Sequence, residues 1–274
     1  MKVSFFNKEL LKQYSVCLSW IIAVYSFIAI FVKIENIGVL TAIIVPLITA
    51  FFSYVLLLIK SNLMITRKII INNSTIHLKF GDIFHETDWK VIPFNEYFDT
   101  QVDEKIIARS TLNGQFLKNH ITDILALDNA IESNLHLKER KQFENIARTH
   151  GKKIQYKLGT IHIHEDYMLT ALSRFDDDGK AFLNISDYFG FLMNFWLEVD
   201  KYYAGKSVTI PLIGSGITRF KDSTLINEQE LLEIILWTFK LSRLRFAYPS
   251  CINIIISPDK KNKINLYELN IKNS

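Results

Sequence analysis

The sequence predicts an α/β domain with a largely parallel or mixed sheet, preceded by a transmembrane helical hairpin. Three observations carry this prediction: two long uncharged apolar stretches near the start, alternating β-like and helical segments after them, and a glycine-containing turn behind a late apolar strand. Strands that alternate with helices along a chain form layered α/β domains. The region after the hairpin, roughly 210 residues, is ample for one sizeable core.

The hairpin is predicted over residues 1–62, with spans at about 13–32 and 37–59. Neither span holds a charged residue, and each is as long as the ~20 apolar residues that cross a bilayer. Only Lys33-Ile34-Glu35-Asn36 separates them. A cleaved signal peptide is disfavoured because a second span follows at once. Without intramembrane charges, the spans indicate neither a conventional transporter nor catalysis inside the membrane.

Charge predicts the orientation of this hairpin. Residues 1–68 hold seven Lys and Arg against two Glu, a net of +5, which leaves a net of −1 for the rest. Because Lys and Arg collect on the cytoplasmic side, both termini and the domain of residues 63–274 are expected there. The basic residues flank the spans and form no patch on the domain, so nucleic-acid binding is not supported.

The first half of the domain is predicted to hold three strands and three helices. Asn72-Asn73 is a dipeptide typical of the turn between two strands, and Gly151 closes the third helix. The predicted strands are Met64–Ile71, Thr75–Phe80 and Trp89–Phe94, and the predicted helices are Ile106–Asn119, Ile121–Ser133 and Lys138–His150.

The second half is predicted to hold two helices among short strands. One helix runs from Ser186 through Tyr203, and the other runs from Glu228 to about Arg245 behind a capping-box pattern, Asn227-x-x-Glu230. The predicted strands are Ile161–His164, Tyr167–Phe175, Ala181–Asn184, Ser207–Leu212, Cys251–Ser257 and Ile264–Leu269. The two cysteines, Cys17 in a span and Cys251 in a strand, are not placed to form a disulfide, as expected in a reducing cytosol.

The glycine loop, Leu212-Ile213-Gly214-Ser215-Gly216, has the composition of an anion site. Glycine permits a positive φ and lets a ligand lie against the backbone. Successive N–H groups in such a turn form a concave nest that favours phosphates. The same spacing also fits an ordinary turn at a strand end, so the surrounding segments decide between the two interpretations.

Those segments also follow strands, and ligands of open α/β sheets bind outside the carboxyl ends of strands. Gly81-Asp82-Ile83 follows an early strand, Asn95 follows the next, and Ser110 to Phe116 form a second glycine-containing loop. Asp82 can accept a hydrogen bond from an adenine amino group, and Asn95 can hold a ribose. Each segment alone also fits a surface turn; their order predicts a cleft for a nucleotide diphosphate.

Other chemistry is not supported. His162 and His164 alternate on one strand, but no third ligand lies at a diagnostic spacing for a metal site. No serine or cysteine nucleophile motif is present. We therefore predict no catalytic residue, no metal and no cofactor other than the ligand itself.

The order of these segments resembles the macro domain, an ADP-ribose-binding module with a three-layer fold and a mixed central sheet. The resemblance lies in Gly81-Asp82-Ile83, in Asn95, and in Ile210-Pro211-Leu212-Ile213-Gly214-Ser215-Gly216-Ile217. It implies that Asp82 lies at adenine and that the glycine loop lies at the phosphates and distal ribose. Two loops depart from the usual macro pattern, Pro93 to Phe98 and Ser110 to Phe116, and these departures favour binding over ADP-ribosyl hydrolysis.

A macro domain behind two spans resembles the membrane-anchored macro-domain effectors of the Thoeris anti-phage defence system. Their local pattern is similar to Pro93–Thr100, Leu112–Phe116 and Ser173–Asp176. The resemblance implies that a TIR-domain partner consumes NAD and releases a diffusible ADP-ribose conjugate, histidine–ADP-ribose in this branch. The conjugate would bind the macro domain at the bacterial inner or plasma membrane. The chain would then oligomerise and disrupt the bilayer, killing or arresting the infected cell.

The alternative function is a membrane-tethered ADP-ribosyl hydrolase or another enzyme that processes NAD metabolites. Both functions use the same cleft. The residues predicted to bind the ligand are Asp82, Ile83, Phe94, Asn95, Ser110, Asn113, Gly114, Gln115, Leu212, Ile213, Gly214, Ser215, Gly216, Ile217 and Thr218.

Overall fold

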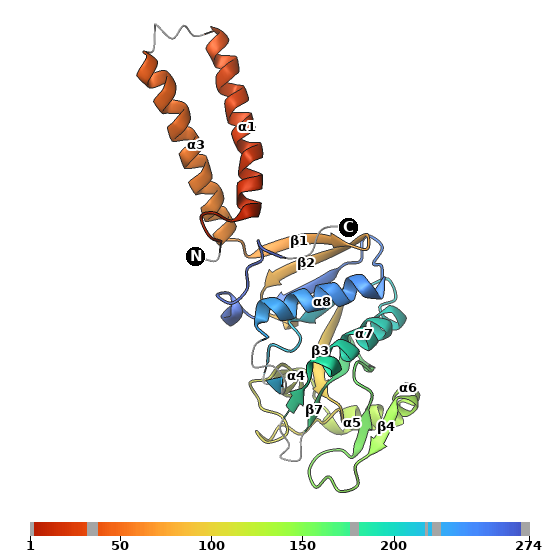
Figure 1. Cartoon of the computed structure of the whole chain (residues 1–274). Helices are drawn as coiled ribbons and strands as arrows, with labels where there is room; N and C mark the ends of the chain where they lie inside the picture. Colours follow the sequence, from red (N-terminus) through yellow and green to blue (C-terminus); the bar gives the residue numbers. More distant parts are fainter. Residues whose placement is uncertain (1–2, 32–37, 176–180, 217–218, 221–225, 270–274) are drawn as a thin grey trace. The chain divides into compact units, whose positions relative to one another are not determined.

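The computed structural model describes residues 3–31, 38–175, 181–216, 219–220 and 226–269 (Figure 1). The chain forms two compact units. The first holds Met1–Arg67 and Asn265–Leu269, and the second is built on Lys68–Ile264.

The first unit is a pair of apolar helices, α1 (Lys8–Phe31) and α3 (Val39–Asn62). Both are long and apolar enough to cross a membrane, as predicted, and their apolar side chains are mostly exposed. Two hydroxyl groups link them: Tyr14 donates to the carbonyl of Ala50 (2.6 Å), and the hydroxyl of Tyr25 lies 2.8 Å from that of Thr49. Each bond gives a tyrosine hydroxyl a partner on the opposite helix.

The segment Asn265–Leu269 belongs to the same unit as this helix pair. Tyr267 is buried in a cluster with Val3, Leu10, Tyr54 and Leu58, and the Arg67 guanidinium donates to the carbonyls of residues 266 (2.6 Å) and 267 (2.5 Å). The strand predicted at Ile264–Leu269 is therefore wrong. Consecutive residues there are buried against the helix base, whereas a strand would bury alternate ones.

The second unit is built on a mixed sheet, ordered β1-β2-β11-β9-β3-β7-β8-β10 with β6 beside β7. The pairs β2–β11, β11–β9, β9–β3 and β3–β7 are parallel, whereas β6 and β8 run antiparallel to β7. A separate pair is β4 with β5. The bounds are β1 Thr66–Ile71, β2 Ser74–Phe80, β3 Trp89–Asn95, β4 Lys141–Glu144, β5 Ile154–Tyr156, β6 Ile161–His164, β7 Tyr167–Phe175, β8 Ala181–Leu183, β9 Val208–Pro211, β10 Arg219–Phe220 and β11 Ile252–Ile256.

Helices pack on both faces of this sheet. Ile92 and Phe94 of β3 pack against Phe116 of α4 and Leu127 of α5, whereas α7 and α8 lie side by side on the other face, where the alternate strand residues point (Figure 1). The bounds are η1 Ile83–His85, α4 Leu112–Asn119, α5 Ile124–Ser133, α6 Leu135–Glu139, α7 Ile185–Tyr202, α8 Glu228–Ser242 and η2 Pro258–Lys260. The predicted α/β class with a mixed sheet is confirmed.

Two predicted helices are wrong in part or in whole. Helix α4 begins at residue 112 instead of 106, because Thr111 caps it by accepting the N–H of Gly114. The helix predicted at Lys138–His150 is instead α6, strand β4 and a turn. Its apolar spacing fits a helix, but residues 141–144 pair as a strand with β5, and Arg148 forms an ion pair with Asp99.

Candidate functional site

A cavity of about 980 Å³ lies at the carboxyl ends of the parallel strands. This volume is within the range of small-molecule sites. Its lining includes most of the residues predicted to bind ligand: Asp82, Ile83, Phe94, Asn95, Ser110, Asn113, Gln115, Leu212, Ile213, Gly214, Ser215 and Gly216. Gly114 is not among the lining residues, and Ile217 and Thr218 lie outside the described residues.

The glycine loop (residues 212–216) is held through its carbonyls and its serine. The Tyr188 hydroxyl donates to the carbonyl of Ile213 (2.7 Å), and Ser215 donates through both N–H and hydroxyl to the carbonyl of Leu212. Gly214 has a φ of 88°. In the described part of the chain, the N–H groups of residues 213, 214 and 216 have no internal acceptor. These donors are available to an anion in the cavity.

Asp82 ends the β2 wall of the cavity. Its Oδ1 accepts the N–H of Phe84 (3.0 Å) and so caps the short helix η1. The side chain is still half exposed, and His85 lies 3.8 Å from Oδ2. One carboxylate oxygen therefore fixes the turn while the other can accept a ligand hydrogen bond.

The second glycine-containing loop contributes the N-terminus of α4. Ser110 and Asn113 line the cavity, and a helix N-terminus favours anions. Gly114 has a structural role instead: a Cβ there would lie 2.2 Å from the carbonyl oxygen of Ala108. The prediction that Gly114 touches ligand therefore finds no support in the lining of the cavity.

The asparagine loop (residues 95–100) uses its polar groups internally. Asn95 Oδ1 accepts the N–H groups of Tyr97 (3.0 Å) and Asp99 (3.3 Å), and its Nδ2 donates to Asp99 Oδ2 (3.0 Å). Phe98 is fully buried with a φ of 51°, a conformation that bulky residues rarely adopt. The register of β3 against β7 also shifts at Phe94/Asn95, and such shifts re-aim side chains.

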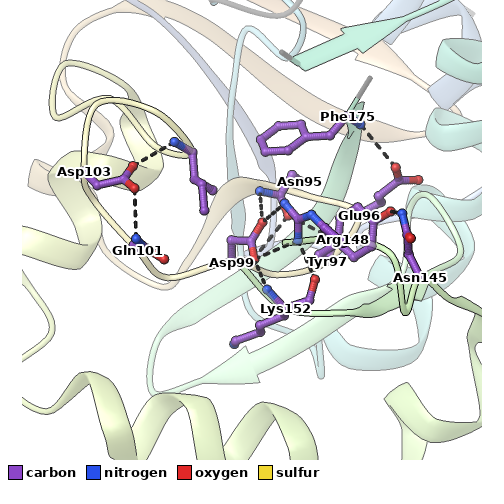
Figure 2. A network of polar contacts seen from close by, with 11 residues as sticks. Asn95, Glu96, Tyr97, Asp99, Gln101, Asp103, Asn145, Arg148, Lys152 and Phe175 are labelled. Carbon is purple, nitrogen blue, oxygen red and sulfur yellow. Dashed lines mark hydrogen bonds and ion pairs between the residues drawn. The ribbon is translucent and has the colours of Figure 1, made fainter. Parts of the chain in front are cut away.

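Arg148 holds this loop from outside (Figure 2). Its two Nη atoms donate to the two oxygens of Asp99 at 3.1 and 2.7 Å, and its guanidinium lies 3.9 Å from the ring centroid of Tyr97. With Asn95 Nδ2 and the two Arg148 nitrogens, the Lys152 N–H (2.7 Å) makes four donors to the Asp99 carboxylate. Asp99 is 1% exposed, so its charge depends on these partners. Lack of a Cβ at Gly151 makes room for the Asp99 carboxylate.

Glu96 links the same loop to β7. It accepts hydrogen bonds from Gln155 (2.5 Å), from Arg174 (3.2 Å) and from the N–H of Phe175 (3.2 Å). Burial raises the pKa of the Glu96 carboxyl above its ordinary value, although these donors oppose the shift. Arg174 also forms a two-bond pair with Asp187 at the start of α7, which raises the pKa of its guanidinium.

Several lining residues are absent from the predicted set. Ser173 and Phe175 of β7 enter the sequence analysis only through a resemblance, Ser257 only as the last residue of the predicted strand Cys251–Ser257, and Lys260 in no predicted element. Strand β11 ends at Ile256, so Ser257 directly follows a strand and the strand-end rule applies to it. Lys105 also lines the cavity, from a stretch just before the Ile106–Asn119 helix that was predicted too long.

Metal chemistry finds no support. Among the described residues, no group of three or more His, Cys, Asp or Glu could hold an ion. His162 is buried, and its Nδ1 lies 2.9 Å from Asn134 Nδ2. Desolvation lowers the pKa of His162 to about 4, so its imidazole is a neutral core group.

Comparison with known proteins places this geometry in a family. Residues 76–257 match the family model described as Thoeris protein ThsA, Macro domain. A Thoeris protein ThsA from Bacillus amyloliquefaciens (strain Y2) is 38% identical over 260 residues, which cover 92% of this chain and 86% of that protein.

Solved macrodomain structures from Oceanobacillus iheyensis are more distant. One with ADP has a TM-score of 0.45 and 13% identity, covering 72% of this chain and 90% of that one. A mutant with ADPR has a TM-score of 0.46 and 15% identity, covering 72% and 92%.

The mixed sheet, the cavity at its strand ends and the family match define a macro domain. The chain belongs to the ThsA family of Thoeris proteins and is an effector of anti-phage defence, as the sequence predicted.

Proposed function

We propose that the cavity binds an ADP-ribose conjugate as a signal and that binding leads to oligomerisation and membrane disruption. The signal is the conjugate, histidine–ADP-ribose in our prediction, that a TIR-domain partner makes from NAD. A two-span hairpin (residues 1–62) in the bacterial membrane would be the output element. The ligand-binding domain (residues 63–274) would be the sensor on the cytoplasmic side.

The observation that carries the proposal is the glycine loop within the cavity. Its N–H groups at residues 213, 214 and 216, which have no acceptor among the described residues, suit a diphosphate. The half-exposed Asp82 carboxylate on another wall suits an amino group. Lys105 and Lys260 also line the cavity and favour a negatively charged ligand. The cavity volume of about 980 Å³ accommodates a dinucleotide-sized molecule.

Binding without turnover is supported by the asparagine loop. The Asn95 carboxamide is tied to its own loop and to Asp99, and Asp99 is tied to Arg148. Both oxygens of the Asp99 carboxylate accept hydrogen bonds from Arg148, and one also accepts a hydrogen bond from Asn95. We therefore place this loop as a rigid wall and assign it no catalytic group.

The continuous segment of residues 257–269 supports a link between the ligand cavity and the helix pair. Ser257, Pro258, Asp259 and Lys260 line the cavity, and only residues 261–264 separate them from the segment Asn265–Leu269 of the first unit. A ligand shifts a conformational equilibrium only through its differential affinity for the two states. Contacts with this stretch are therefore a route by which occupancy can bias the helix pair.

The binding step is tested by calorimetry on the full chain in detergent. We expect tight binding of histidine–ADP-ribose, weaker binding of ADP-ribose, and no new product when the mixture is analysed by mass spectrometry. Turnover would support the hydrolase instead, and an absence of binding by either compound would overturn the proposal.

The output step is tested by dye release from liposomes that contain the full chain. We expect release only when ligand is added on the domain side. A chain lacking residues 1–62 should retain binding and release no dye. Release from that shortened chain, or equal release with and without ligand, would contradict the membrane role.

A further inference from the structure

Helix α8 carries an apolar row that the core of the domain does not use. Leu232, Ile235 and Phe239 are buried toward the sheet. Ile234, Trp237 and Leu241 follow the helical spacing on the outer side, where the exposed fractions are 44% for Trp237 and 61% for Leu241. Exposed tryptophan is enriched at the centres of protein interfaces.

The neighbouring helix α7 carries a second such row. Trp196 joins the two helices: its indole N–H donates to the Thr238 hydroxyl (3.1 Å), and its ring packs edge-on to Phe239. On the outer side of α7, Phe189 and Leu197 are 41% and 64% exposed. We call these residues, Phe189, Met193, Leu197, Ile234, Trp237 and Leu241, the α7/α8 face.

Charges on α8 have a symmetry that identifies an occupant. Glu233 and Lys240 lie equally far from a point between residues 236 and 237, and so do Glu230 and Arg243. Glu233 and Lys240 are seven residues apart, roughly 10 Å along the helix, so they do not pair with each other. Each has a contact on its own helix: Glu233 Oε1 accepts a hydrogen bond from Gln229 Nε2 (3.2 Å), and Lys240 Nζ lies 5.6 Å from the ring centroid of Trp237. An intermolecular pair would add to or replace these contacts. Two antiparallel copies of α8 crossing at Trp237 would place each acid opposite a base of the other copy.

We propose that the α7/α8 face is a two-fold interface with a second copy of this chain. The apolar row would form its centre and the two kinds of charge pair its rim, as in isologous contacts. An anionic lipid surface would instead select an excess of Lys and Arg, whereas α8 carries both signs here. The inference deepens the oligomerisation in the proposed function by naming its surface.

The test measures association of the full chain in lipid nanodiscs or liposomes by energy transfer between labelled copies. We expect Trp237→Ala to weaken association roughly thirty-fold, because a central anchor is lost from both copies. We expect Lys240→Glu to weaken it about five-fold, because Glu233 of each copy then faces a like charge. Leu125→Ala, which truncates an exposed leucine on α5 (75%), is the matched control and should change nothing.

Exchanging the two charges tests the interface more specifically than either single substitution. The double variant Glu233→Lys with Lys240→Glu should return association to within about two-fold of the natural chain, because each pair is restored with reversed sign. Failure of this rescue, or full association of Trp237→Ala, would overturn the interface.

Calorimetry on the same variants reads ligand binding separately. Variants that bind ligand normally have kept their fold, so a loss of association is not a loss of structure. If the natural chain associates through this face but binds no ADP-ribose conjugate, the interface stands and the proposed function falls.

Discussion

Two loops at the same edge of the sheet line one cavity in opposite ways. The glycine loop is held by hydrogen bonds to its carbonyls, and its N–H groups at residues 213, 214 and 216 have no acceptor among the described residues. The polar atoms of the asparagine loop form hydrogen bonds within the loop, with Arg148 and with Arg174 of β7. Each contains one residue with positive φ, Gly214 at 88° and Phe98 at 51°.

The difference indicates a division of work within the site. A loop with unused donors gains its partners only when a ligand arrives, so it contributes directly to affinity. A loop with satisfied polar groups contributes shape, and its strained residue persists because its surroundings over-determine it. We therefore expect changes in the glycine loop to alter binding, and changes around the asparagine loop to alter stability.

The largest expected effect follows from Gly216→Glu. Among the described residues, no atom lies within 4 Å of a Cβ placed at Gly216, so we expect the substitution to preserve the fold. A carboxylate would then stand where we place the diphosphate, and like charges at a contact cost several kcal/mol. We expect ligand affinity to fall by roughly 1,000-fold, about 4 kcal/mol, in calorimetry.

Gly216→Ala is the matched control, because a methyl group adds neither charge nor a clash with the protein. Its affinity should stay within about three-fold of the natural chain. Unchanged affinity in Gly216→Glu would refute the placement of phosphate at the glycine loop.

Arg148→Ala addresses the other loop. Asp99 is 1% exposed and would lose its main counter-charge, and removal of one partner of a buried pair costs about 3 kcal/mol or more. We expect a clear drop in thermal stability, with ligand affinity lowered only as far as the loop moves. Differential scanning fluorimetry and calorimetry separate the two.

The control is Arg109→Ala. Arg109 is paired with Glu104 at 3.7 Å, but both side chains are mostly exposed, so its loss should cost less than about 0.5 kcal/mol. Equal effects of the two arginine substitutions would show that the Asp99 pair does not hold the loop.

Gly214→Ala tests whether the positive φ of Gly214 requires glycine, and Gly190 in helix α7 is the comparison. At a φ of 88°, alanine costs about 1 kcal/mol, and a shifted turn should weaken ligand binding about five-fold. Gly190→Ala, on an open face of α7 with nothing within 4 Å, should instead stabilise the domain by about 0.5–1 kcal/mol. The same sign for both would contradict the argument from φ.

The strands of the sheet and most of the loops that line the cavity could be predicted from the sequence, because both follow from local periodicity. Strands β2, β3, β9 and β11 show as apolar runs, and their carboxyl ends locate a cleft wherever the sheet is parallel. Asp82 and the glycine loop were found in this way. Ser257 follows the same rule, but the predicted strand Cys251–Ser257 ran one residue past the end of β11 and placed Ser257 inside the strand.

The errors arose where distant contacts overrode local pattern. The stretch Lys138–His150 has helical apolar spacing, but Arg148 bonds Asp99, which is far away in sequence. Leu266 resembles part of a strand, yet Arg67 binds its carbonyl at the helix base. Whether the Asn95 amide faces a ligand or its own loop also depends on Asp99, and no spacing in the sequence shows that.

The smallest expected effect is a pH dependence at Glu96. Burial raises the pKa of this carboxyl in the folded chain above its unfolded value. Between those two pKa values the folded state holds the proton and the unfolded state does not, so stability falls as pH rises through this window.

Glu96→Gln removes the titrating group. The stability of the natural chain relative to Glu96→Gln should therefore improve as pH is lowered through this window. Thermal unfolding at a series of pH values measures the difference, and Glu86→Gln, whose carboxylate pairs with Lys79 near the surface, controls for general charge effects. A difference that is flat with pH, or that grows in favour of Glu96→Gln on acidification, would mean that Arg174 and Gln155 outweigh burial and that the asparagine loop is held by a fully charged Glu96.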